Sequence, residues 1–379
     1  MVEVTDGEPT ERAQRWAATM AGHRSQLAGV RHAHDGPLAS LGPLTVFDRE
    51  AREEAERQLL APGATRSQGA GRRLRGEEPD EWRTCFEKDR DRILHSSAFR
   101  RLAGKTQVFI FPTDHQRTRL THALEVAQIA RAIATALRLN VALAEAIALG
   151  HDGGHGPFGH ASEDAFDPLV PGGFDHAPWG ADVTLASLNL THEVSDGIRN
   201  HSWSRPAPRT PEGEVCAIAD RLGYATHDAE DAARAGIVDL GDLPQIVVDR
   251  AGTTRSQQLQ AFIRDVVVTS QRGGTVGMSE GLAEALASLR AWNYERIYLR
   301  PESVTQGKSV VRLLRSLVEH YVAHPAELPR DGGAHVDDSP EHAAVSYVAG
   351  MTDRFACAQA ARVLRWSPSE MPEGFDRPS

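Results

Sequence analysis

The sequence is poor in cysteine and contains no long apolar run. Its 379 residues include only Cys85, Cys216 and Cys357, which are odd in number and lack C-x-x-C spacing. This usage fits a reducing compartment and argues against a disulfide framework or a zinc finger. No stretch approaches the 18 consecutive apolar residues that a membrane helix requires, so we expect no membrane partner.

An excess of positive charge is also missing. The 42 basic and 52 acidic side chains give a formal net charge of −10, so an anionic ligand would need a local basic pocket. The N-terminal stretch MVEVTDGEPTERAQRW is polar and acidic and has no apolar segment of the kind that defines a signal peptide. We therefore expect a cytoplasmic protein.

Helical periodicity dominates the chain, and we predict an all-α fold: a helical bundle with an additional C-terminal helical region. Residues 1–76 are interpreted as a variable extension that ends in a basic linker, PGATRSQGAGRRLRG, predicted to be a solvated loop. Residues 77–240 are predicted to form the core, and residues 241–379 a helical region packed on it. The predicted helices cover 50–60, 117–139, 141–152, 185–200, 212–235, 257–268, 279–298, 309–323 and 343–364.

The helix over 117–139 is the clearest in the sequence. Its apolar face is assigned to Leu120, Leu124, Ala127, Ile129, Ile133 and Leu137. A second helix over 141–152 follows after a short turn, so the two should pack antiparallel. A weaker amphipathic stretch lies near 12–27, and 106–111 suits a short extended segment.

Closely spaced arginines precede this hairpin. Arg90, Arg92, Arg100 and Arg101 fall on a different face from the apolar positions of their predicted helix. Such a run marks either a solvated face or a wall that faces phosphate groups.

The most informative stretch is HDGGHGPFGH, residues 151–160. It places three histidines and one carboxylate within ten positions and follows a largely apolar helix. Gly153 and Gly154 are expected to end that helix through positive φ. Buried imidazole and carboxylate side by side are costly unless they are paired or bind a metal.

The predicted hairpin directs His122, near the start of one helix, towards His151 and Asp152 at the end of the other. With a second aspartate from a later helix, these side chains would form a site of nitrogen and oxygen donors. Such donors suit Mn, Fe, Mg, Co or Zn and leave positions open for water and substrate. The lack of thiolates argues against a structural zinc site.

The order His122, His151-Asp152, Asp220 resembles the H…HD…D pattern of the HD superfamily of metal-dependent phosphohydrolases. The surrounding segments resemble, more narrowly, the deoxynucleoside triphosphate triphosphohydrolases, or dGTPase family. These segments are DRDRILHSSAFRRLAGKTQVF, TRLTHALEVAQIAR, HDGGHGPFGHASE, LNLTHEV, ADRLGYATHDAED and SYVAGMTDRFA, and they cover roughly residues 80–360.

The resemblance implies an enzyme that hydrolyses a dNTP to deoxynucleoside and tripolyphosphate. It implies a divalent metal held by His122, His151, Asp152 and Asp220. Among the catalytic candidates His155, His160, Glu163 and His176, the pair His160 and Glu163 is three residues apart, so the carboxylate could orient the imidazole. By the same resemblance His176 would face the phosphates.

The resemblance also implies residues that contact the substrate. Arg119 would grip the triphosphate, Asp228 would accept from the 3′-hydroxyl, and the ring of Tyr224 would disfavour ribonucleotides. Gln107 and Tyr298 are weaker matches, for which a structural role is equally compatible. The chain departs from the family pattern at Gly153 and in the loop after His176.

Two other interpretations stay open. The metal site could act on another substrate, such as a monophosphate, a cyclic nucleotide or ppGpp. Alternatively, the chain could be a nucleotide sensor or single-strand nucleic-acid binder that uses Arg72, Arg73 and Arg75. Nucleic acid could also regulate a hydrolase, and a homo-oligomer is compatible with the helices.

Overall fold

The computed structural model describes residues 9–112, 115–329 and 339–375, and these are predominantly α-helical, as predicted. Strand in these ranges is confined to one antiparallel pair and two isolated bridges. By their internal contacts, residues 1–47 and 48–379 form two separate compact units. No helix of the described ranges has the length and apolar character needed to cross a membrane.

The first unit begins with α1 (Glu11–Thr19), where the sequence predicts an amphipathic stretch. Thr10 caps this helix by accepting a hydrogen bond from the Ala13 amide at 3.2 Å. A short hairpin of β1 (His23–Arg24) and β2 (Arg31–His32) follows, which was not predicted from the sequence. None of the side chains of α1 is buried.

The second unit contains the predicted helices, with shifted ends and some additions. Its helices are α2 (Arg49–Leu59), α3 (Cys85–His95), α4 (Ser97–Arg101), α5 (Arg119–Ala136), α6 (Val141–Gly150), α7 (His160–Phe166), α8 (His176–Trp179), α9 (His192–Arg199), α10 (Pro211–Arg234), α11 (Gln245–Ala251), α12 (Arg255–Gly273), α13 (Glu280–Asn293), α14 (Pro301–Ala323), α15 (Pro340–Ala349) and α16 (Asp353–Gln359). Short 3-10 turns cover Leu102–Gly104, His151–Gly154, Asp167–Leu169, Ala186–Leu188, Leu240–Asp242, Pro325–Glu327 and Pro368–Glu370, and π-helical turns cover Gly180–Thr184, Tyr294–Tyr298 and Ala360–Leu364.

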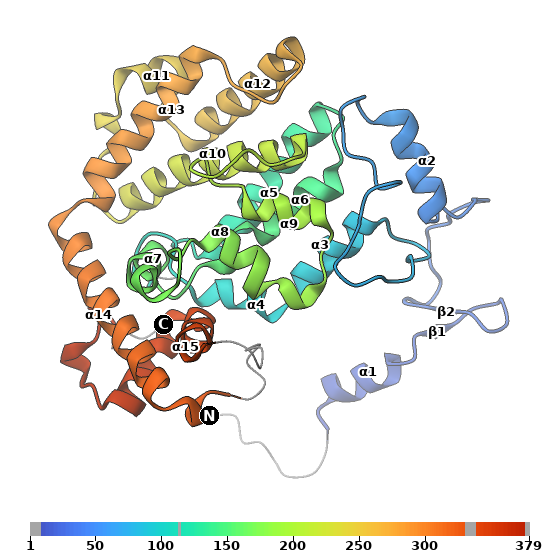
Figure 1. Cartoon of the computed structure of the whole chain (residues 1–379). Coiled ribbons are helices and arrows are strands. Elements are labelled where there is room, and N and C mark those ends of the chain that lie inside the picture. Colours follow the sequence, from blue (N-terminus) through green and yellow to red (C-terminus); the bar gives the residue numbers. More distant parts are fainter. Residues whose placement is uncertain (1–8, 113–114, 330–338, 376–379) are drawn as a thin grey trace. The chain divides into compact units, whose positions relative to one another are not determined.

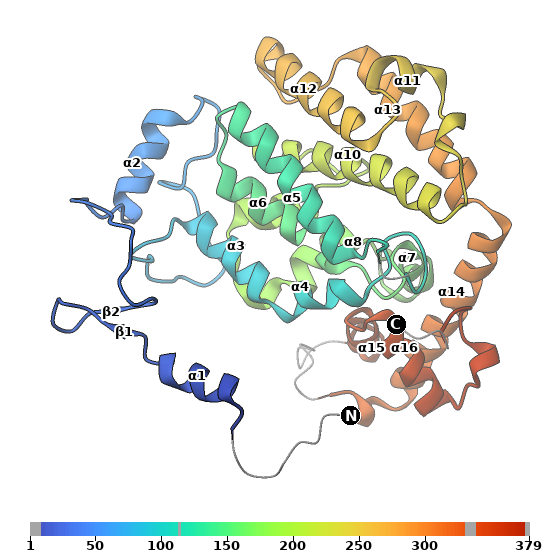
Figure 2. The same cartoon turned by 180° about the vertical axis from the view of Figure 1, so that it is seen from behind.

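The α5–α6 hairpin lies at the centre of this unit (Figure 1). Asn140 caps α6 by accepting from the Leu143 amide at 3.2 Å. Helix α3 packs on α6, and α10 packs on both α5 and α6; Figure 2 shows the same grouping from behind. The N-terminal end of α5, which carries His122, lies next to the C-terminal end of α6, which His151 follows.

The buried face of α5 contains half of the predicted apolar positions, Ala127, Ile129 and Ile133, and Leu120 and Leu137 pack partly buried against the core. Arg119, His122, Ala123 and Val126 are buried, whereas Leu124 is 47% exposed. Alanines at many of the buried positions let α6 and α10 approach closely. The predicted face is therefore confirmed in part, and it is wrong at Leu124.

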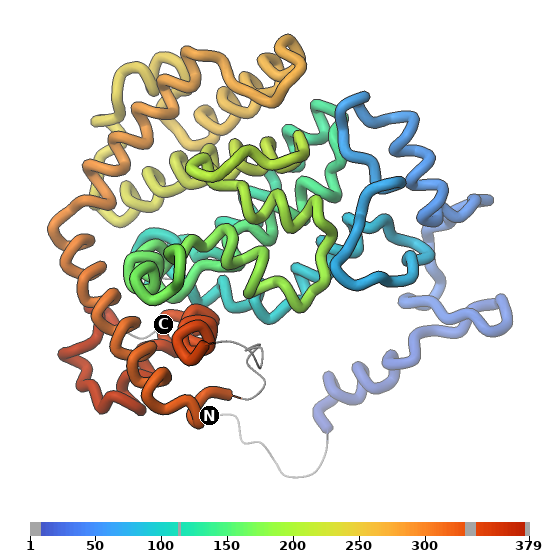
Figure 3. Tube along the Cα trace, in the orientation of Figure 1, coloured from blue at the N-terminus to red at the C-terminus, as the bar shows by residue number. Residues whose placement is uncertain are grey.

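A second apolar core links the C-terminal helices to the segment after the α5–α6 hairpin. It joins α14, α15 and α16 to Phe158, Phe166, Phe174 and Trp179. Helix α14 runs beside α7, as the tube in Figure 3 shows. The ring of Trp179, in the loop that departs from the family pattern, lies 4.8 Å from that of Phe174.

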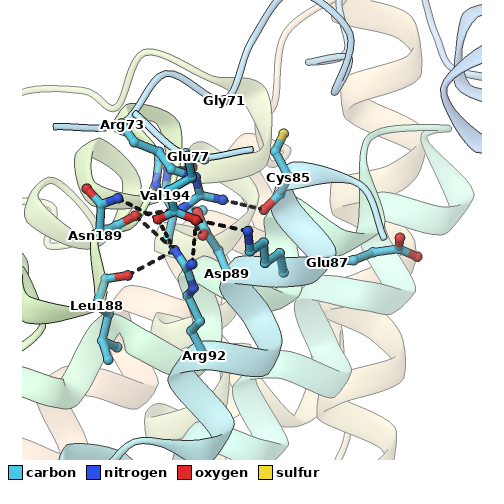
Figure 4. Close-up of polar contacts among 12 residues, drawn as sticks. Gly71, Arg73, Glu77, Cys85, Glu87, Asp89, Arg92, Leu188, Asn189 and Val194 are labelled. Atoms are coloured by element: carbon cyan, nitrogen blue, oxygen red, sulfur yellow. Dashed lines mark hydrogen bonds and ion pairs between the residues drawn. The ribbon is translucent and has the colours of Figure 1, made fainter. Parts of the chain in front are cut away.

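The basic linker is not the solvated loop that the sequence predicts. Arg73 forms an ion pair with the buried Asp89 and donates to the carbonyls of Asn189 (2.6 Å) and Cys85 (3.1 Å). Figure 4 shows this packing, which ties the linker to α3 and to the turn before α9. Arg75 likewise donates to the Ser187 carbonyl at 3.1 Å.

Three further sequence expectations were inaccurate. Residues 106–111 form a series of bends rather than an extended segment. The helix predicted over 185–200 is shorter, because a left-handed residue, Asn189 (φ 53°), precedes it. The single helix predicted over 343–364 is divided into α15, α16 and the π-helical turn Ala360–Leu364.

Candidate active site

Three predicted metal ligands come together where the α5–α6 hairpin ends. One ligand atom from each of His122, His151 and Asp152 can be chosen so that all lie within 4.8 Å of one another. All three side chains are buried. Helix α5 supplies the first, and the 3-10 turn that follows α6 supplies the other two. The antiparallel packing inferred from the sequence therefore brings these residues together.

Helix α10 adds Asp220 to this group. Its Oδ1 atom lies 3.1 Å from His122 Nε2 and 3.5 Å from His151 Nε2. Gly223, one turn further, lets α10 pack closely on α5, because a Cβ there would lie 3.2 Å from Val126. The four residues form one connected cluster, which we call the HD cluster.

The tautomer of His151 is the one that metal binding through Nε2 requires. Its Nδ1 atom lies 2.6 Å from the Ala148 carbonyl, so this nitrogen carries the proton and donates it. The Nε2 atom is buried, has no hydrogen-bond partner in the described structure, and lies 3.4 Å from Asp152 Oδ1. A backbone contact of this kind fixes the tautomer of a metal-ligating histidine.

Charge within the HD cluster shifts its pKa values in opposite directions. Burial lowers the pKa of His151, but the carboxylates of Asp152 and Asp220 outweigh it and raise that pKa to about 9. Burial raises the pKa of Asp152, yet Arg119 and the neighbouring histidines bring it well below its usual range. Without another cation, the two carboxylates thus hold a proton on the histidine.

The two glycines after Asp152 are needed for space rather than for positive φ, contrary to the sequence prediction. A Cβ on Gly154 would lie 2.0 Å from the His176 carbonyl oxygen and 2.3 Å from the Gly180 amide nitrogen. The turn that carries the metal ligands therefore touches the backbone around α8. At Gly153 the nearest neighbour is Leu185, at 3.2 Å.

Arg119 lies beside the HD cluster and is 1% exposed. Its Nη1 donates to Asp152 Oδ2 at 2.7 Å, while Nε and Nη2 are buried without hydrogen-bond partners in the described structure. Gly159 approaches the same guanidinium, since a Cβ there would lie 2.5 Å from Nη2. Unpaired buried guanidinium donors are costly and favour an anionic ligand.

A second group of histidines adjoins the HD cluster. The rings of His155 and His176 are stacked at 3.7 Å, and His155 Nε2 lies 3.3 Å from Asp152 Oδ1. The ring of His160 meets that of His155 edge-on at 5.1 Å and is exposed. The carboxylate of Glu163 takes His176 as its partner, at 2.5 Å from Nδ1, rather than the His160 that its spacing suggested.

His201 is the member of this group that sequence reasoning missed. Its Nδ1 donates to the Ile198 carbonyl at 2.8 Å, and its Nε2 lies 3.2 Å from Nε2 of His176. Both ring nitrogens of His176 therefore have protein partners, so this ring does not present a free donor to phosphates as the resemblance implied. His201 follows the end of α9 without any local motif, and only its contacts reveal it.

The arginines of α3 and α4 do not form the phosphate-facing wall considered from the sequence. Arg90 is paired with Glu145 at 3.1 Å, and Arg92 with Glu77 at 2.6 Å. Arg100 and Arg101 donate to the backbone carbonyls of His95 and Gly350. These charges stabilise the packing of the helices.

The sugar-contact candidates of α10 lie beyond the HD cluster. Tyr298 donates a hydrogen bond to Asp228 Oδ2, and burial raises the pKa of Asp228 to about 7. The guanidinium of Arg290 lies 5.7 Å from the centre of the half-buried Tyr224 ring. Gln107 has a buried Oε1 without a hydrogen-bond partner in the described ranges.

The residues present fit a divalent cation. Imidazole nitrogen and carboxylate oxygen are donors for such ions, and the unpartnered Nε2 of His151 faces the two carboxylates. A divalent cation here would neutralise the carboxylates of Asp152 and Asp220, so His151 would no longer need to be protonated. Next to it, the unpaired donors of Arg119 supply the positive charge that a phosphate group requires.

Comparisons with known proteins agree with this arrangement. Residues 119–225 match the HD domain and residues 276–362 match the phosphohydrolase-associated domain. A deoxyguanosinetriphosphate triphosphohydrolase-like protein from Caldanaerobacter subterraneus subsp. tengcongensis is 42% identical, over 84% of this chain and 96% of its own.

Proteins of the same description from other bacteria are also similar. The one from Clostridium perfringens is 41% identical, over 81% of this chain and 94% of its own. The one from Desulfatibacillum aliphaticivorans is 38% identical, over 84% of this chain and 99% of its own.

A crystal structure of a hypothetical protein from Aquifex aeolicus aligns with a TM-score of 0.41 at 20% identity, over 73% of this chain and 71% of that one.

Proposed function

This chain belongs to the family of deoxyguanosinetriphosphate triphosphohydrolase-like proteins, which are HD-domain phosphohydrolases, and we propose that it hydrolyses deoxynucleoside triphosphates to deoxynucleoside and tripolyphosphate. The observation that carries this proposal is the HD cluster beside the unpaired donors of Arg119. The first suits a divalent metal, and the second suits a polyanion. The name shared by the relatives supports a triphosphate substrate.

His122, His151, Asp152 and Asp220 would hold the metal, with Mn²⁺, Mg²⁺, Fe, Co and Zn as the candidates that their donors allow. When bound, such an ion polarises a phosphoryl oxygen and lowers the pKa of coordinated water. The chain's own residues then have the tasks of binding, orienting and proton transfer.

Arg119 would bind the phosphate next to the metal. Its Nη1 is fixed by Asp152, so the guanidinium plane is held, and the unpartnered Nε and Nη2 would donate to the phosphate. Charge that develops on the α-phosphate is stabilised by donors that need no reorganisation during the reaction. A lysine could not supply this fork of donors.

His160 would donate the proton to the leaving 5′ oxygen or manage the attacking water. It is the most exposed of the three rings, because His155 and His176 are stacked on each other and buried. Glu163 and His201 hold His176, and His176 supports His155 by stacking. In this proposal His176 orients its neighbour instead of contacting phosphate.

Asp228 and Tyr298 would bind the sugar. The phenol donates to Asp228 Oδ2, which leaves Oδ1 to accept from a 3′-hydroxyl. Tyr224 lies one turn before Asp228 on the same face of α10, and its ring would occupy the space of a 2′-hydroxyl. Gln107, with its unpartnered Oε1, would accept a hydrogen bond from the nucleotide.

The test is to incubate the purified protein with each dNTP and rNTP in Mn²⁺ or Mg²⁺, singly and mixed, and to separate the products by chromatography. Tripolyphosphate together with a deoxynucleoside supports the proposal. Orthophosphate or pyrophosphate would instead place the HD cluster in another phosphohydrolase reaction. His160→Ala should keep the metal and lose about 10²- to 10⁴-fold in kcat, the range of general acid catalysis.

A further inference from the structure

The segment SYVAGMTDRFA, near the C-terminus, has no role in the site described so far. Its aspartate, Asp353, begins α16 and is 3% exposed. Burying a carboxylate is unfavourable unless several donors satisfy it. The hydrogen-bond donors that satisfy Asp353 therefore identify the segments that this side chain stabilises.

Asp353 holds two segments at once. Its Oδ2 accepts from the Thr106 amide at 2.9 Å and from the Thr106 hydroxyl at 2.6 Å. Its Oδ1 accepts from the Phe158 amide at 2.7 Å. Thr106 bridges Thr118, the residue before α5, and Phe158 lies between His155 and His160.

The segment at Phe158 needs this support because its backbone is in an unfavourable conformation. Phe158 has φ 63° and Gly159 has φ 64°. A bulky residue in the left-handed region is strained, and such residues persist where their surroundings fix them. The same Gly159 touches the guanidinium of Arg119, so a change at Phe158 would reach that side chain.

Lys105 makes a second connection of the same kind. The residue is 4% exposed, and its ammonium group donates to the carbonyls of His155 and Ala349, the latter at 2.9 Å. Its own carbonyl accepts from the Arg119 amide at 3.1 Å. Burial lowers the pKa of Lys105 to about 7 and raises the pKa of Asp353, and the attraction between the two charged groups opposes both shifts.

We propose that Asp353, together with Lys105, is a remote positioning residue: it fixes the backbone of Phe158 and Thr106, and through them the placement of Arg119, His155 and His160. The C-terminal helices would then control the geometry of the site without touching substrate. This inference deepens the proposed function and rests on it for its kinetic readout.

Asp353→Asn is the main test, because it keeps the size of the side chain. The amide NH2 group of asparagine cannot accept a hydrogen bond. It would face a backbone N–H of either Phe158 or Thr106, so the hydrogen bonds to one of these two segments are lost. We expect kcat to fall about 10- to 100-fold, as for small displacements of reacting groups, with KM changed less than threefold and metal content retained. Glu341→Gln is the matched control, since it removes a carboxylate from the first turn of α15, where it is exposed.

Hydrogen exchange measured by mass spectrometry gives a readout that needs no activity. In Asp353→Asn, amides of the 155–160 segment should exchange at least tenfold faster than in Glu341→Gln. If the unmodified protein hydrolyses no dNTP, the proposed function fails, and this exchange measurement still decides the inference. Unchanged exchange would overturn it.

A pair of milder variants covers the case in which Asp353→Asn does not fold. Thr106→Val removes the hydroxyl that donates to Asp353, while Thr106→Ser keeps it. We expect Thr106→Val to lose severalfold in kcat and Thr106→Ser to restore it. Equal kcat in these two variants, or in Asp353→Asn and Glu341→Gln, would show that this contact does not position the site.

Discussion

The contact between the metal-ligand turn and α8 can be tested by adding one methyl group. In Gly154→Ala the new Cβ would lie 2.0 Å from the His176 carbonyl oxygen, whereas ordinary contact begins at 3.4 Å. The His176 oxygen belongs to the backbone, and the backbone of residue 154 fixes the position of Cβ, so no side-chain rotation relieves the overlap. The turn and α8 must therefore separate by more than about 1 Å, which is the scale of displacement that costs about 100-fold in rate.

The same separation should lower stability. Overpacking of this kind costs about 1–3 kcal/mol, and the residues next to Gly154 include Asp152 and His155, so metal affinity should also fall. The assay is kcat/KM for the preferred dNTP, with bound metal and urea unfolding measured on the same sample. We expect kcat/KM to drop at least 30-fold relative to the unmodified protein.

Gly307→Ala provides the matched control. Gly307 lies inside α14, and a Cβ there meets no atom within 4 Å. Alanine is favoured over glycine inside a helix by about 0.5–1 kcal/mol, so this variant should be slightly more stable and fully active. Full activity and stability in Gly154→Ala would refute the reasoning, because they would require the turn and α8 to lie further apart than described.

Other predictions concern charge. Asp220→Asn should lose most of its bound metal and activity while circular dichroism shows unchanged helicity; full activity would remove it from the ligand set. Because burial raises the pKa of Asp228 to about 7, the folded protein holds a proton that the unfolded chain releases above pH 4. The free energy of unfolding should therefore fall between about pH 4 and 7, by up to about 4 kcal/mol, and Asp228→Asn should flatten this slope in urea titrations. Arg73→Ala leaves Asp89 buried and unpaired, so it should cost about 3–5 kcal/mol, against less than about 0.5 kcal/mol for the exposed neighbour Arg72→Ala; equal unfolding midpoints would contradict this.

Local patterns predicted the helices and the meeting of His122 with His151 and Asp152. An antiparallel hairpin fixes which helix ends are adjacent, so sequence position is enough to place those side chains. The exposure of Leu124 on α5 was not predictable by counting large apolar residues. Alanines occupy many of the buried positions of this helix, and the polar Arg119 and His122 also lie on its buried side, where they take part in the site.

Side-chain partners were harder to predict than helices. The spacing of His160 and Glu163 suggested a pair, but α8 brings His176 nearer to the carboxylate. A helical i, i+3 pair gains only a few tenths of a kcal/mol, whereas the partly buried carboxylate of Glu163 pairs with the more buried His176. His201 and Asp353 depend in the same way on segments far along the chain, and neither has a local signal.

These cases follow one physical rule. An exposed polar side chain pairs mainly with neighbours along the chain, which is what local spacing predicts. A buried polar side chain must be paired to offset its desolvation, and its partner comes from whichever helix packs against it. Arg73 shows the rule outside the site: a basic linker is expected to be solvated, yet the buried Asp89 draws its guanidinium inward. An arginine used in this way is not free to bind nucleic acid. Arg119 differs from Arg73, because it is buried while its Nε and Nη2 have no hydrogen-bond partner in the described structure. A buried charge with unused donors indicates a ligand.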